Sequence, residues 1–108
     1  MSDYPTTPVT NINFLNHLIR LIRERKAQRD DPQAAESSYT VSLFQRGINK
    51  IAQKVGEEAV ELVIEAKDSD DQLFKNEAAD LIFHLLVLLE EKEIPLEEVI
   101  QVLENRHR

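Results

Sequence analysis

The chain has 108 residues, a formal net charge of −7, 42% hydrophobic residues, two glycines and no cysteine. This length suits a single domain, and the scarcity of glycine favours a helical fold over a disordered or all-β one. The net negative charge argues against a broad nucleic-acid-binding face, so we expect no DNA or RNA partner. The absence of cysteine excludes a disulfide framework, a thiolate nucleophile and a cysteine-based zinc site.

The N-terminal sequence MSDYPTTPVT has no basic flank followed by an apolar segment, which argues against a signal peptide. The longest nearly apolar run, LIFHLLVLL at residues 81–89, is much shorter than the roughly 20 residues that a membrane-spanning helix needs. We therefore expect a cytoplasmic protein that does not contact a membrane. Residues 1–10 are expected to form a flexible arm, and residues 11–108 a single all-α domain.

Apolar residues recur at helical spacing along four segments and predict an antiparallel helical bundle. The expected helices cover residues 13–28, residues 40–67, residues 71–91 and a segment that starts near Pro95. Ser38 or Thr40 is expected to cap the second helix, and a short turn at residues 68–70 joins the second helix to the third. The basic residues of the first helix are expected to form a solvated face.

The second expected helix carries an apolar stripe that we place in the core: Phe44, Ile48, Ile51, Val55 and Leu62. Gly56 lies inside this helix, where glycine costs roughly 1 kcal/mol relative to alanine. We expect this glycine to allow the close approach of a ligand or of a neighbouring helix, with helix packing the favoured explanation.

The second half of the third expected helix is apolar almost all the way around, which predicts burial on several sides. A single small bundle would cover both faces poorly, so we expect a homodimer that buries the excess apolar surface. The alternative is a monomer with this helix at its centre.

The glutamates in KVGEEAVELVIEA, residues 54–66, are spaced in a way that opposes helix stability. Glu57 and Glu61 lie four residues apart, as do Glu61 and Glu65, and a like-charged pair at this spacing costs roughly 0.2–0.5 kcal/mol. At about 100° per residue, Glu58, Glu61 and Glu65 fall beside the apolar stripe, whereas Glu57 points further toward solvent. A requirement other than helix stability therefore shapes this segment.

The third helix repeats the arrangement, because Glu77 and Asp80 flank its apolar stripe. If the second and third helices pack antiparallel through these stripes, their acidic pairs face each other. Such carboxylates either have raised pKa values or share a cation. Oxygen ligands without cysteine favour a hard divalent ion, Mg²⁺ or Mn²⁺. The alternative is a set of ordinary surface glutamates on acidic helices.

Two further features border these acidic side chains. Arg46, Lys50 and Lys54 lie four residues apart and predict a basic ridge, which would oppose the helix dipole and is suited to binding substrate phosphates. For Lys54, an ion pair with the glutamate four residues later is the alternative. His84 is either a core histidine with a satisfied hydrogen bond or a residue that orients the carboxylate of Asp80.

The motif EEAVE at residues 57–61, followed by EAAD at residues 77–80, resembles the paired acidic motif of the all-α, MazG-type nucleotide pyrophosphohydrolases. The surrounding sequence is more specific. The segments SYTVSLFQRGINKIAQKVGEEAVELVIEA, NEAADLIFHLLVLL and LEEVIQVLENRH are similar to the phosphoribosyl-ATP pyrophosphohydrolase family of histidine biosynthesis. LNHLIRLIRERK fits that family's first helix, so the resemblance covers residues 14–107.

This resemblance implies Mg²⁺-dependent hydrolysis of phosphoribosyl-ATP to phosphoribosyl-AMP and pyrophosphate by a helical homodimer. The implied metal ligands are Glu58, Glu61, Glu77 and Asp80, and the candidate catalytic residues are Glu57 and Glu58. A metal ion neutralises phosphates and lowers the pKa of its bound water, and a glutamate can accept the proton of that water. Some relatives fuse a cyclohydrolase domain that uses cysteine and zinc; without cysteine, only the pyrophosphohydrolase step is implied here.

Two other functions fit parts of the pattern. A housecleaning pyrophosphatase for dUTP or damaged nucleotides would share the fold and the metal site and would differ only around the base and ribose. A non-catalytic helical dimerisation module would show no dependence on Mg²⁺. The loop RDDPQAAESS, residues 29–38, is a few residues longer than the usual link in the resembled family, which leaves its role open.

Overall fold

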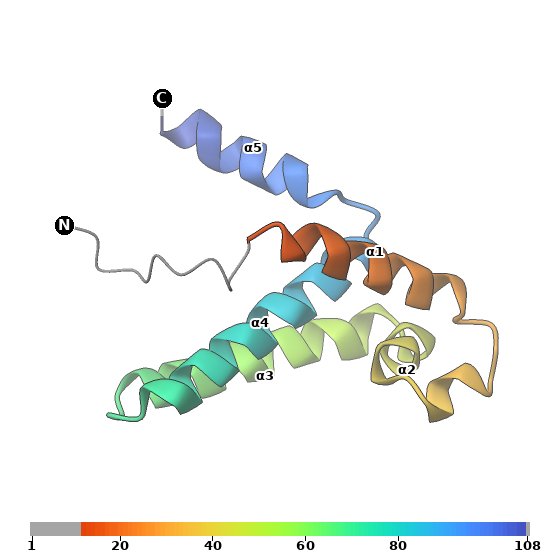
Figure 1. Cartoon of the computed structure of the whole chain (residues 1–108), viewed down its shortest axis with the longest axis horizontal. Coiled ribbons are helices and arrows are strands. Elements are labelled where there is room, and N and C mark those ends of the chain that lie inside the picture. Colours follow the sequence, from red (N-terminus) through yellow and green to blue (C-terminus); the bar gives the residue numbers. More distant parts are fainter. Residues whose placement is uncertain (1–11, 108) are drawn as a thin grey trace.

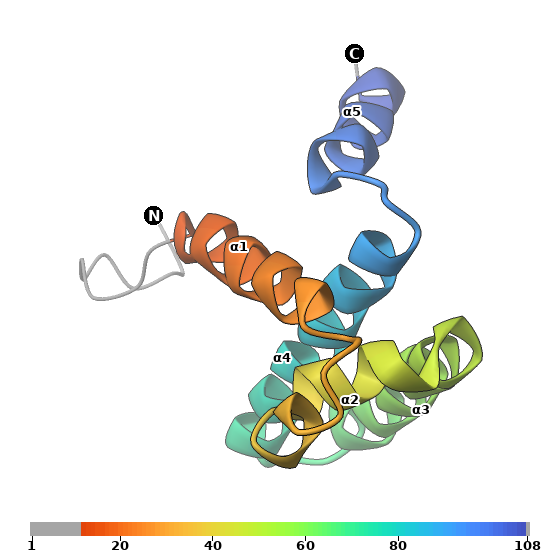
Figure 2. The same cartoon turned by 90° about the vertical axis from the view of Figure 1, so that its right-hand side faces the viewer.

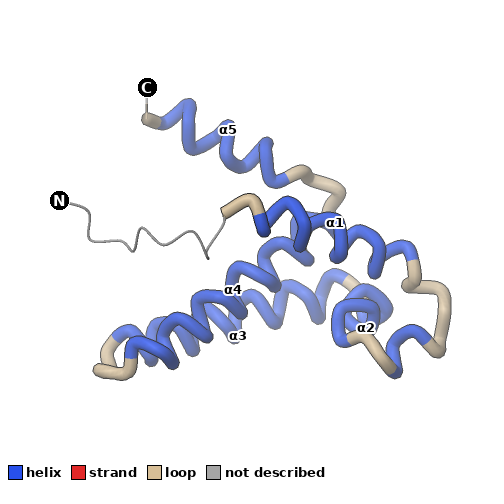
Figure 3. The backbone as a smooth tube through the Cα atoms, viewed as in Figure 1, coloured by secondary structure: helices blue, strands red, loops and turns tan. Residues whose placement is uncertain are grey.

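The computed structural model of the chain describes residues 12–107, and this part contains helices and no strand (Figure 1, Figure 3). The helices are α1 (Phe14–Ala27), the 3-10 helix η1 (Ala34–Glu36), α2 (Tyr39–Arg46), α3 (Ile48–Ala66), α4 (Asp71–Glu91) and α5 (Leu96–Arg106). The prediction of an all-α fold is therefore confirmed. The expected flexible arm, residues 1–10, lies outside the described residues. Within residues 12–107, no helix combines the length and the apolar character that crossing a membrane requires.

Helices α3 and α4 form an antiparallel hairpin and pack along most of their lengths (Figure 1). The turn between them ends at Asp70, whose side chain caps α4 by accepting hydrogen bonds from the backbone N–H groups of Gln72 and Leu73 at 3.0 and 3.1 Å. These donors have no partner within the helix, so the cap defines where α4 begins. The predicted antiparallel pairing of the two helices through a short turn is confirmed.

The predicted single helix over residues 40–67 is wrong, because Gly47 divides it into α2 and α3. Its φ of 88° and ψ of −177° belong to a region of backbone space that is essentially restricted to glycine. The change of direction at this glycine rotates the faces of the two helices relative to each other. Phe44 and Ile51 are buried as expected, but Ile48 is 45% exposed, so its predicted place in the core is wrong.

Two local predictions for this region have different outcomes. Ser38 caps α2, because its hydroxyl accepts a hydrogen bond from the backbone N–H of Val41 at 3.1 Å. A Cβ atom at Gly56, in contrast, would meet no atom within 4 Å beyond the adjacent backbone of its own helix. The helix expected to pack closely on this glycine is therefore not found among the described residues.

The core lies where α1, α2 and α3 meet the second half of α4. Its buried apolar residues are Ile22, Leu43, Phe44, Ile51, Leu86 and Val87. Helix α5 follows α4 after a short connection and stands away from the other helices (Figure 2). The core thus anchors the end of α4 that is remote from the turn, and leaves much of α5 exposed.

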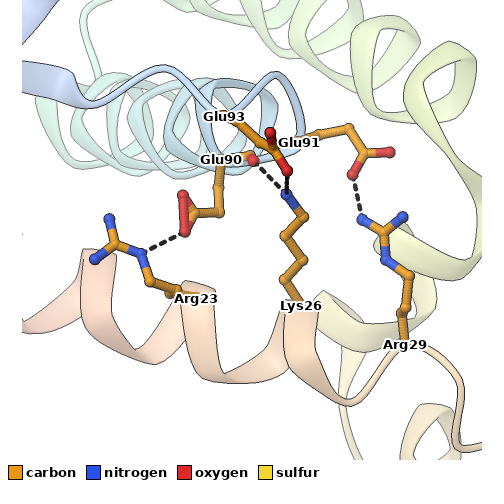
Figure 4. Close-up of polar contacts among 6 residues, drawn as sticks. All are labelled: Arg23, Lys26, Arg29, Glu90, Glu91 and Glu93. Carbon is orange, nitrogen blue, oxygen red and sulfur yellow. Dashed lines mark hydrogen bonds and ion pairs between the residues drawn. The ribbon is translucent and has the colours of Figure 1, made fainter.

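A group of ion pairs, here called the α1–α4 clamp, joins the C-terminal part of α1 and the following loop to the end of α4 (Figure 4). The pairs are Arg23–Glu90, Lys26–Glu93 and Arg29–Glu91. Lys26 also donates a hydrogen bond to the backbone carbonyl of Glu90 at 2.8 Å. A cation at this position compensates the negative end of the α4 dipole. The expected solvated face of α1 is therefore only partly correct, because Arg23 and Lys26 bind α4.

Helix α4 ends in a Schellman motif with Glu93 in the left-handed conformation, at φ 58°. The backbone N–H groups of Ile94 and Glu93 donate to the carbonyls of Leu89 and Glu90 at 2.9 and 3.0 Å. Glycine is the usual residue at this position of the motif. Glu93 therefore adopts an unfavourable backbone conformation, and its side chain forms an exposed ion pair with Lys26.

We predict that Glu93→Gly stabilises the protein by about 0.5–1 kcal/mol. The left-handed conformation costs a non-glycine residue about 1–2 kcal/mol, whereas the added chain entropy of glycine costs about 0.5–1 kcal/mol. The ion pair with Lys26 adds little, because the Glu93 side chain is 84% exposed. Urea unfolding measures the difference. Glu93→Ala is the matched control: it removes the same carboxylate but keeps the unfavourable φ, so it should not stabilise. Equal effects of the two variants would contradict the prediction.

Candidate functional site

Three carboxylates meet across the α3–α4 hairpin and form a group that we call the acidic cluster. Glu58 comes from α3, and Glu77 and Asp80 come from α4. One oxygen atom of each lies within 4.8 Å of the others, a spacing at which all three can bind one metal ion. Glu58 is only 7% exposed, so the cluster includes a buried carboxylate. The sequence predicted that these three side chains would face one another, and the structure brings them together.

One carboxylate oxygen of Glu58 and one of Glu77 lack a hydrogen-bond partner within the described part of the chain. The Oε2 atoms of Glu58 and Glu77 are buried, and neither has a partner among the described residues. Lys54 provides a cation next to Glu58, with its Nζ 3.5 Å from the other carboxylate oxygen, Oε1. Buried, unpaired carboxylate oxygens are costly unless a cation or a proton satisfies them. An oxygen-only set of this kind fits a hard divalent cation.

The proton affinity of Glu77 reflects this crowding. A side-chain hydrogen bond with Glu61, burial, and the negative charges of Glu61 and Glu58 raise the pKa of Glu77 to about 7. A protonated Glu77 can donate its O–H to a neighbouring carboxylate, which relieves the repulsion in the absence of a cation. A metal ion at the acidic cluster would therefore compete with this proton.

The two remaining glutamates of the EEAVE motif lie at the edge of the cluster. Glu61 is exposed and outside the group of three, although it interacts with Glu77. Glu57 is also exposed, as expected from its position around the helix. Gln53 donates a hydrogen bond to Glu57 at 3.1 Å. This bond lowers the pKa of Glu57, and the positive charges of Lys54 and Lys50 act in the same direction. Glu57 thus presents an ionised carboxylate beside the cluster rather than within it.

The basic residues do not form the continuous ridge that the sequence predicted. Arg46 is the last residue of α2, whereas Lys50 and Lys54 belong to α3, and the break at Gly47 separates them. Among residues 12–107, Lys54 forms ion pairs with Glu58 at 3.5 Å and with an oxygen of Glu57 at 3.7 Å, whereas Arg46 and Lys50 form none. Binding of phosphate by Arg46, Lys50 and Lys54 stays a prediction.

Sequence reasoning missed one residue at this site, Tyr39. Its hydroxyl lies 2.8 Å from Nε2 of His84, and Nδ1 of His84 lies 2.7 Å from the backbone carbonyl oxygen of Asp80. His84 is 5% exposed, so both of its ring nitrogens find partners inside the protein. Tyr39 and His84 are 45 residues apart in the chain. No local pattern indicates such a pairing, which depends on how α2 folds back over α4.

The fold and the site together define a class: an all-α protein whose two acidic motifs meet across a helical hairpin, like the MazG-type nucleotide pyrophosphohydrolases. Comparisons with known proteins identify the family within this class. The model of the family described as phosphoribosyl-ATP pyrophosphohydrolase matches residues 15–107. The chain therefore belongs to the phosphoribosyl-ATP pyrophosphohydrolase family.

Curated relatives agree with the family match. The chain is 49% identical over 86 residues to the phosphoribosyl-ATP pyrophosphatase of Listeria innocua, which covers 80% of this chain and 81% of that protein. It is 50% identical over 94 residues to the histidine biosynthesis bifunctional protein HisIE of Bacillus subtilis, covering 87% of this chain and 43% of that protein. It is 52% identical over 88 residues to HisIE of Halalkalibacterium halodurans, covering 82% of this chain and 39% of that protein. The chain thus spans less than half the length of these bifunctional relatives.

The raised pKa of Glu77 predicts a specific pH dependence of stability in the metal-free protein. The ordinary carboxyl value is 4.5 and the folded value is about 7, so the folded state binds this proton more tightly than the unfolded state does. The contribution of Glu77 to stability is therefore full below pH 4.5 and is lost as the pH rises through about 7. Thermal melts in EDTA should show the melting temperature of the wild type falling relative to that of Glu77→Gln across this window.

Glu104→Gln is the control for these melts, because it removes an exposed carboxyl group on α5. Its melting temperature should stay parallel to that of the wild type at every pH. A constant difference in melting temperature between the wild type and Glu77→Gln from pH 4.5 to above 7 would show that the pKa of Glu77 is not raised.

Proposed function

We propose that the chain hydrolyses phosphoribosyl-ATP to phosphoribosyl-AMP and pyrophosphate, the second step of histidine biosynthesis, and that the reaction depends on Mg²⁺. One observation carries this proposal: a member of the phosphoribosyl-ATP pyrophosphohydrolase family holds three carboxylates from two helices within 4.8 Å of one another. Because this substrate and its products are water-soluble, we also propose that the enzyme acts in the cytoplasm.

The proposed metal ligands are Glu58, Glu61, Glu77 and Asp80. Glu58, Glu77 and Asp80 form the acidic cluster. Glu61 lies next to Glu77. When bound, Mg²⁺ would supply positive charge to the phosphates and lower the pKa of a coordinated water. Mn²⁺ has similar ligand preferences and can substitute. The buried, unpaired oxygens of Glu58 and Glu77 support this assignment.

Proton transfer is assigned to Glu57 and Glu58. Glu57 is exposed beside the acidic cluster, and its lowered pKa keeps it ionised and able to accept a proton from water. Glu58 is buried and carries an oxygen without a partner. Neither residue needs to form a covalent bond to the substrate, which agrees with the absence of cysteine from the chain.

We assign the binding of the substrate phosphates to Arg46, Lys50 and Lys54. Lys54 already lies between two carboxylates, and its side chain is 25% exposed, so it can move toward a phosphate at the rim of the cluster. The assignment of Arg46 requires the chain to bring it near Lys50 across the break at Gly47. His84 is proposed to steady Asp80 through its hydrogen bond to the backbone carbonyl of that residue.

We also propose that the protein is a homodimer. Large apolar side chains are exposed on the outer faces of the hairpin and on α5: Val60, Val63, Ile64, Leu73, Ile82, Leu85, Ile100, Val102 and Leu103. Exposed apolar surface of this extent is typical of an interface between subunits. The open space around Gly56, one turn from Val60, would let a helix of a second copy approach closely.

The dimer is tested with a charge on the outer face of α3. Val63 is 56% exposed, so Val63→Lys should leave the monomer folded but place a charge in the proposed interface, where burial without a partner is costly. Sedimentation equilibrium should give twice the chain mass of 12.5 kDa for the wild type and the single mass for the variant. Ile12→Lys is the matched control, because Ile12 is 80% exposed and lies just before α1. A wild type with the mass of a single chain would refute the dimer.

Turnover of competing substrates tests the reaction. With Mg²⁺ present, phosphoribosyl-ATP should be hydrolysed to equal amounts of phosphoribosyl-AMP and pyrophosphate. Its kcat/KM should be at least about 100-fold higher than the values for dUTP and dCTP. This ratio corresponds to about 3 kcal/mol of transition-state stabilisation. If dUTP were the best substrate, the protein would be a housecleaning pyrophosphatase instead. If no nucleotide were hydrolysed, a binding module would be the remaining interpretation.

Asp80→Asn and Glu61→Gln separate the metal site from the fold. Each removes one negative charge from a crowded region, so the metal-free variants should melt at or above the wild-type temperature. Both should lose hydrolysis. Asp80→Asn should also lose the stabilisation that Mg²⁺ gives the wild type, a free energy of about 2.7 kcal/mol at 100 times the Kd that is seen as a rise in melting temperature. Glu104→Gln should retain activity and the response to Mg²⁺. Unchanged turnover in both site variants would exclude the assigned ligands.

A further inference from the structure

A chain of two hydrogen bonds connects Tyr39 to the acidic cluster through His84. The backbone carbonyl of Asp80 can only accept, so Nδ1 of His84, 2.7 Å away, carries a proton and donates it. In the neutral ring, Nε2 is then without a proton. Nε2 lies 2.8 Å from the hydroxyl of Tyr39 and must accept its O–H. The partners on both sides of His84 therefore determine the direction of both bonds.

This direction determines what Tyr39 offers to the site. Its single proton is used by His84, so the hydroxyl oxygen presents only lone pairs to its remaining surroundings. Phosphate oxygens are acceptors as well and cannot pair with it. A suitable partner must donate a hydrogen bond, as a water molecule, an ammonium group or another N–H or O–H group can.

The hydroxyl of Tyr39 is separated from the backbone of Asp80 by the width of one imidazole ring, because the two nitrogens of His84 bond to these groups at 2.8 and 2.7 Å. Burial raises the pKa of Tyr39, the charge of Lys54 opposes this change, and the negative charges of Glu58 and Asp80 add to it. The ammonium group of Lys54 already lies between Glu58 and a second glutamate. An ammonium group has three N–H donors, but these two carboxylates attract Lys54, which favours a water molecule over Lys54 as the donor to Tyr39.

The ring of Tyr39 is held in place although the residue is 52% exposed. It stacks on Phe83 with ring centroids 6.4 Å apart and an angle of 30° between the rings. It also meets the ring of His84 edge-on, at 5.8 Å and 80°. These contacts fix the oxygen in one position while leaving part of the residue open to solvent.

We propose that Tyr39 is a positioning residue of the metal centre, whose hydroxyl oxygen accepts a hydrogen bond from a water ligand of the divalent cation at the acidic cluster. The inference rests on the proposed function, because it requires a cation at that cluster. Mg²⁺ usually keeps several of its waters when it binds to protein carboxylates. Partners of this kind orient metal ligands, and their loss typically weakens metal affinity or activity 10- to 100-fold.

Tyr39→Phe tests the proposal, because it removes only the oxygen and keeps the ring contacts with Phe83 and His84. Calorimetric titration of the metal-free protein with Mn²⁺, without nucleotide, should give a Kd raised about tenfold. Ser42→Ala is the matched control: it removes a hydroxyl from the same helix, one that donates only to the backbone carbonyl of Tyr39 at 2.6 Å. Its Kd for Mn²⁺ should equal that of the wild type.

A second variant covers the possibility that Tyr39→Phe disturbs folding. His84→Gln removes the ring that orients the tyrosine hydroxyl and should also weaken Mn²⁺ binding. Both substitutions break the same chain of hydrogen bonds. The Kd of the double variant for Mn²⁺ should therefore be no higher than that of whichever single variant has the higher Kd. Additive losses would overturn the proposed coupling.

The outcomes distinguish this inference from the proposed function. If the wild type binds Mn²⁺ and Tyr39→Phe binds it within twofold of the wild type, Tyr39 has a structural role only and the inference fails, while the metal centre stands. If the wild type binds no Mn²⁺, the proposed function and this inference fail together. A lower melting temperature of Tyr39→Phe with unchanged Mn²⁺ affinity also identifies a purely structural hydrogen bond.

Discussion

The packing of α3 against α4 holds three carboxylates together against their mutual repulsion, and the rest of the site depends on this constraint. Glu58, Glu77 and Asp80 would move apart if the helices were free, because like charges at this distance repel strongly where water is partly excluded. The apolar core, which includes Ile51 of α3 and Leu86 and Val87 of α4, opposes that separation. Without a cation, the raised pKa of Glu77 shows how the protein tolerates the arrangement, by retaining a proton near neutral pH.

The elements around the hairpin determine what else reaches the acidic cluster. On an uninterrupted helix, Tyr39 would lie about 22 Å along the axis from Lys54, at 1.5 Å per residue. The glycine conformation at Gly47 turns α2 back, so that Tyr39 contacts His84 and is influenced by the charge of Lys54. The α1–α4 clamp acts at the other end of α4, where it fixes the last turn of the helix that carries two of the three carboxylates. The backbone conformation of Gly47 and the α1–α4 clamp thus help to position the acidic cluster, although neither is part of it.

The hairpin buries only one side of each of its helices. Its inner side forms the acidic cluster and part of the core, whereas Val60, Val63 and Ile82 on its outer sides are about half exposed. Helix α5 adds a further apolar surface that stands away from the core (Figure 2). Stabilisation by burial grows with the apolar area removed from water, so a second copy that covers these surfaces would stabilise the same hairpin that holds the carboxylates.

The sequence by itself determined the all-α fold, the antiparallel hairpin and the three carboxylates of the acidic cluster, because these depend on local periodicity. Apolar spacing places Glu58, Glu77 and Asp80 at the edges of buried stripes, and a short turn makes those edges face each other. Tertiary structure alone decided the rest. The break at Gly47 divides what the pattern reads as one helix, since apolar periodicity carries no information about φ. The pairing of Tyr39 with His84 and the clamp between α1 and α4 join residues more than 40 positions apart. Such contacts follow from the directions in which helices pack, which no local pattern encodes.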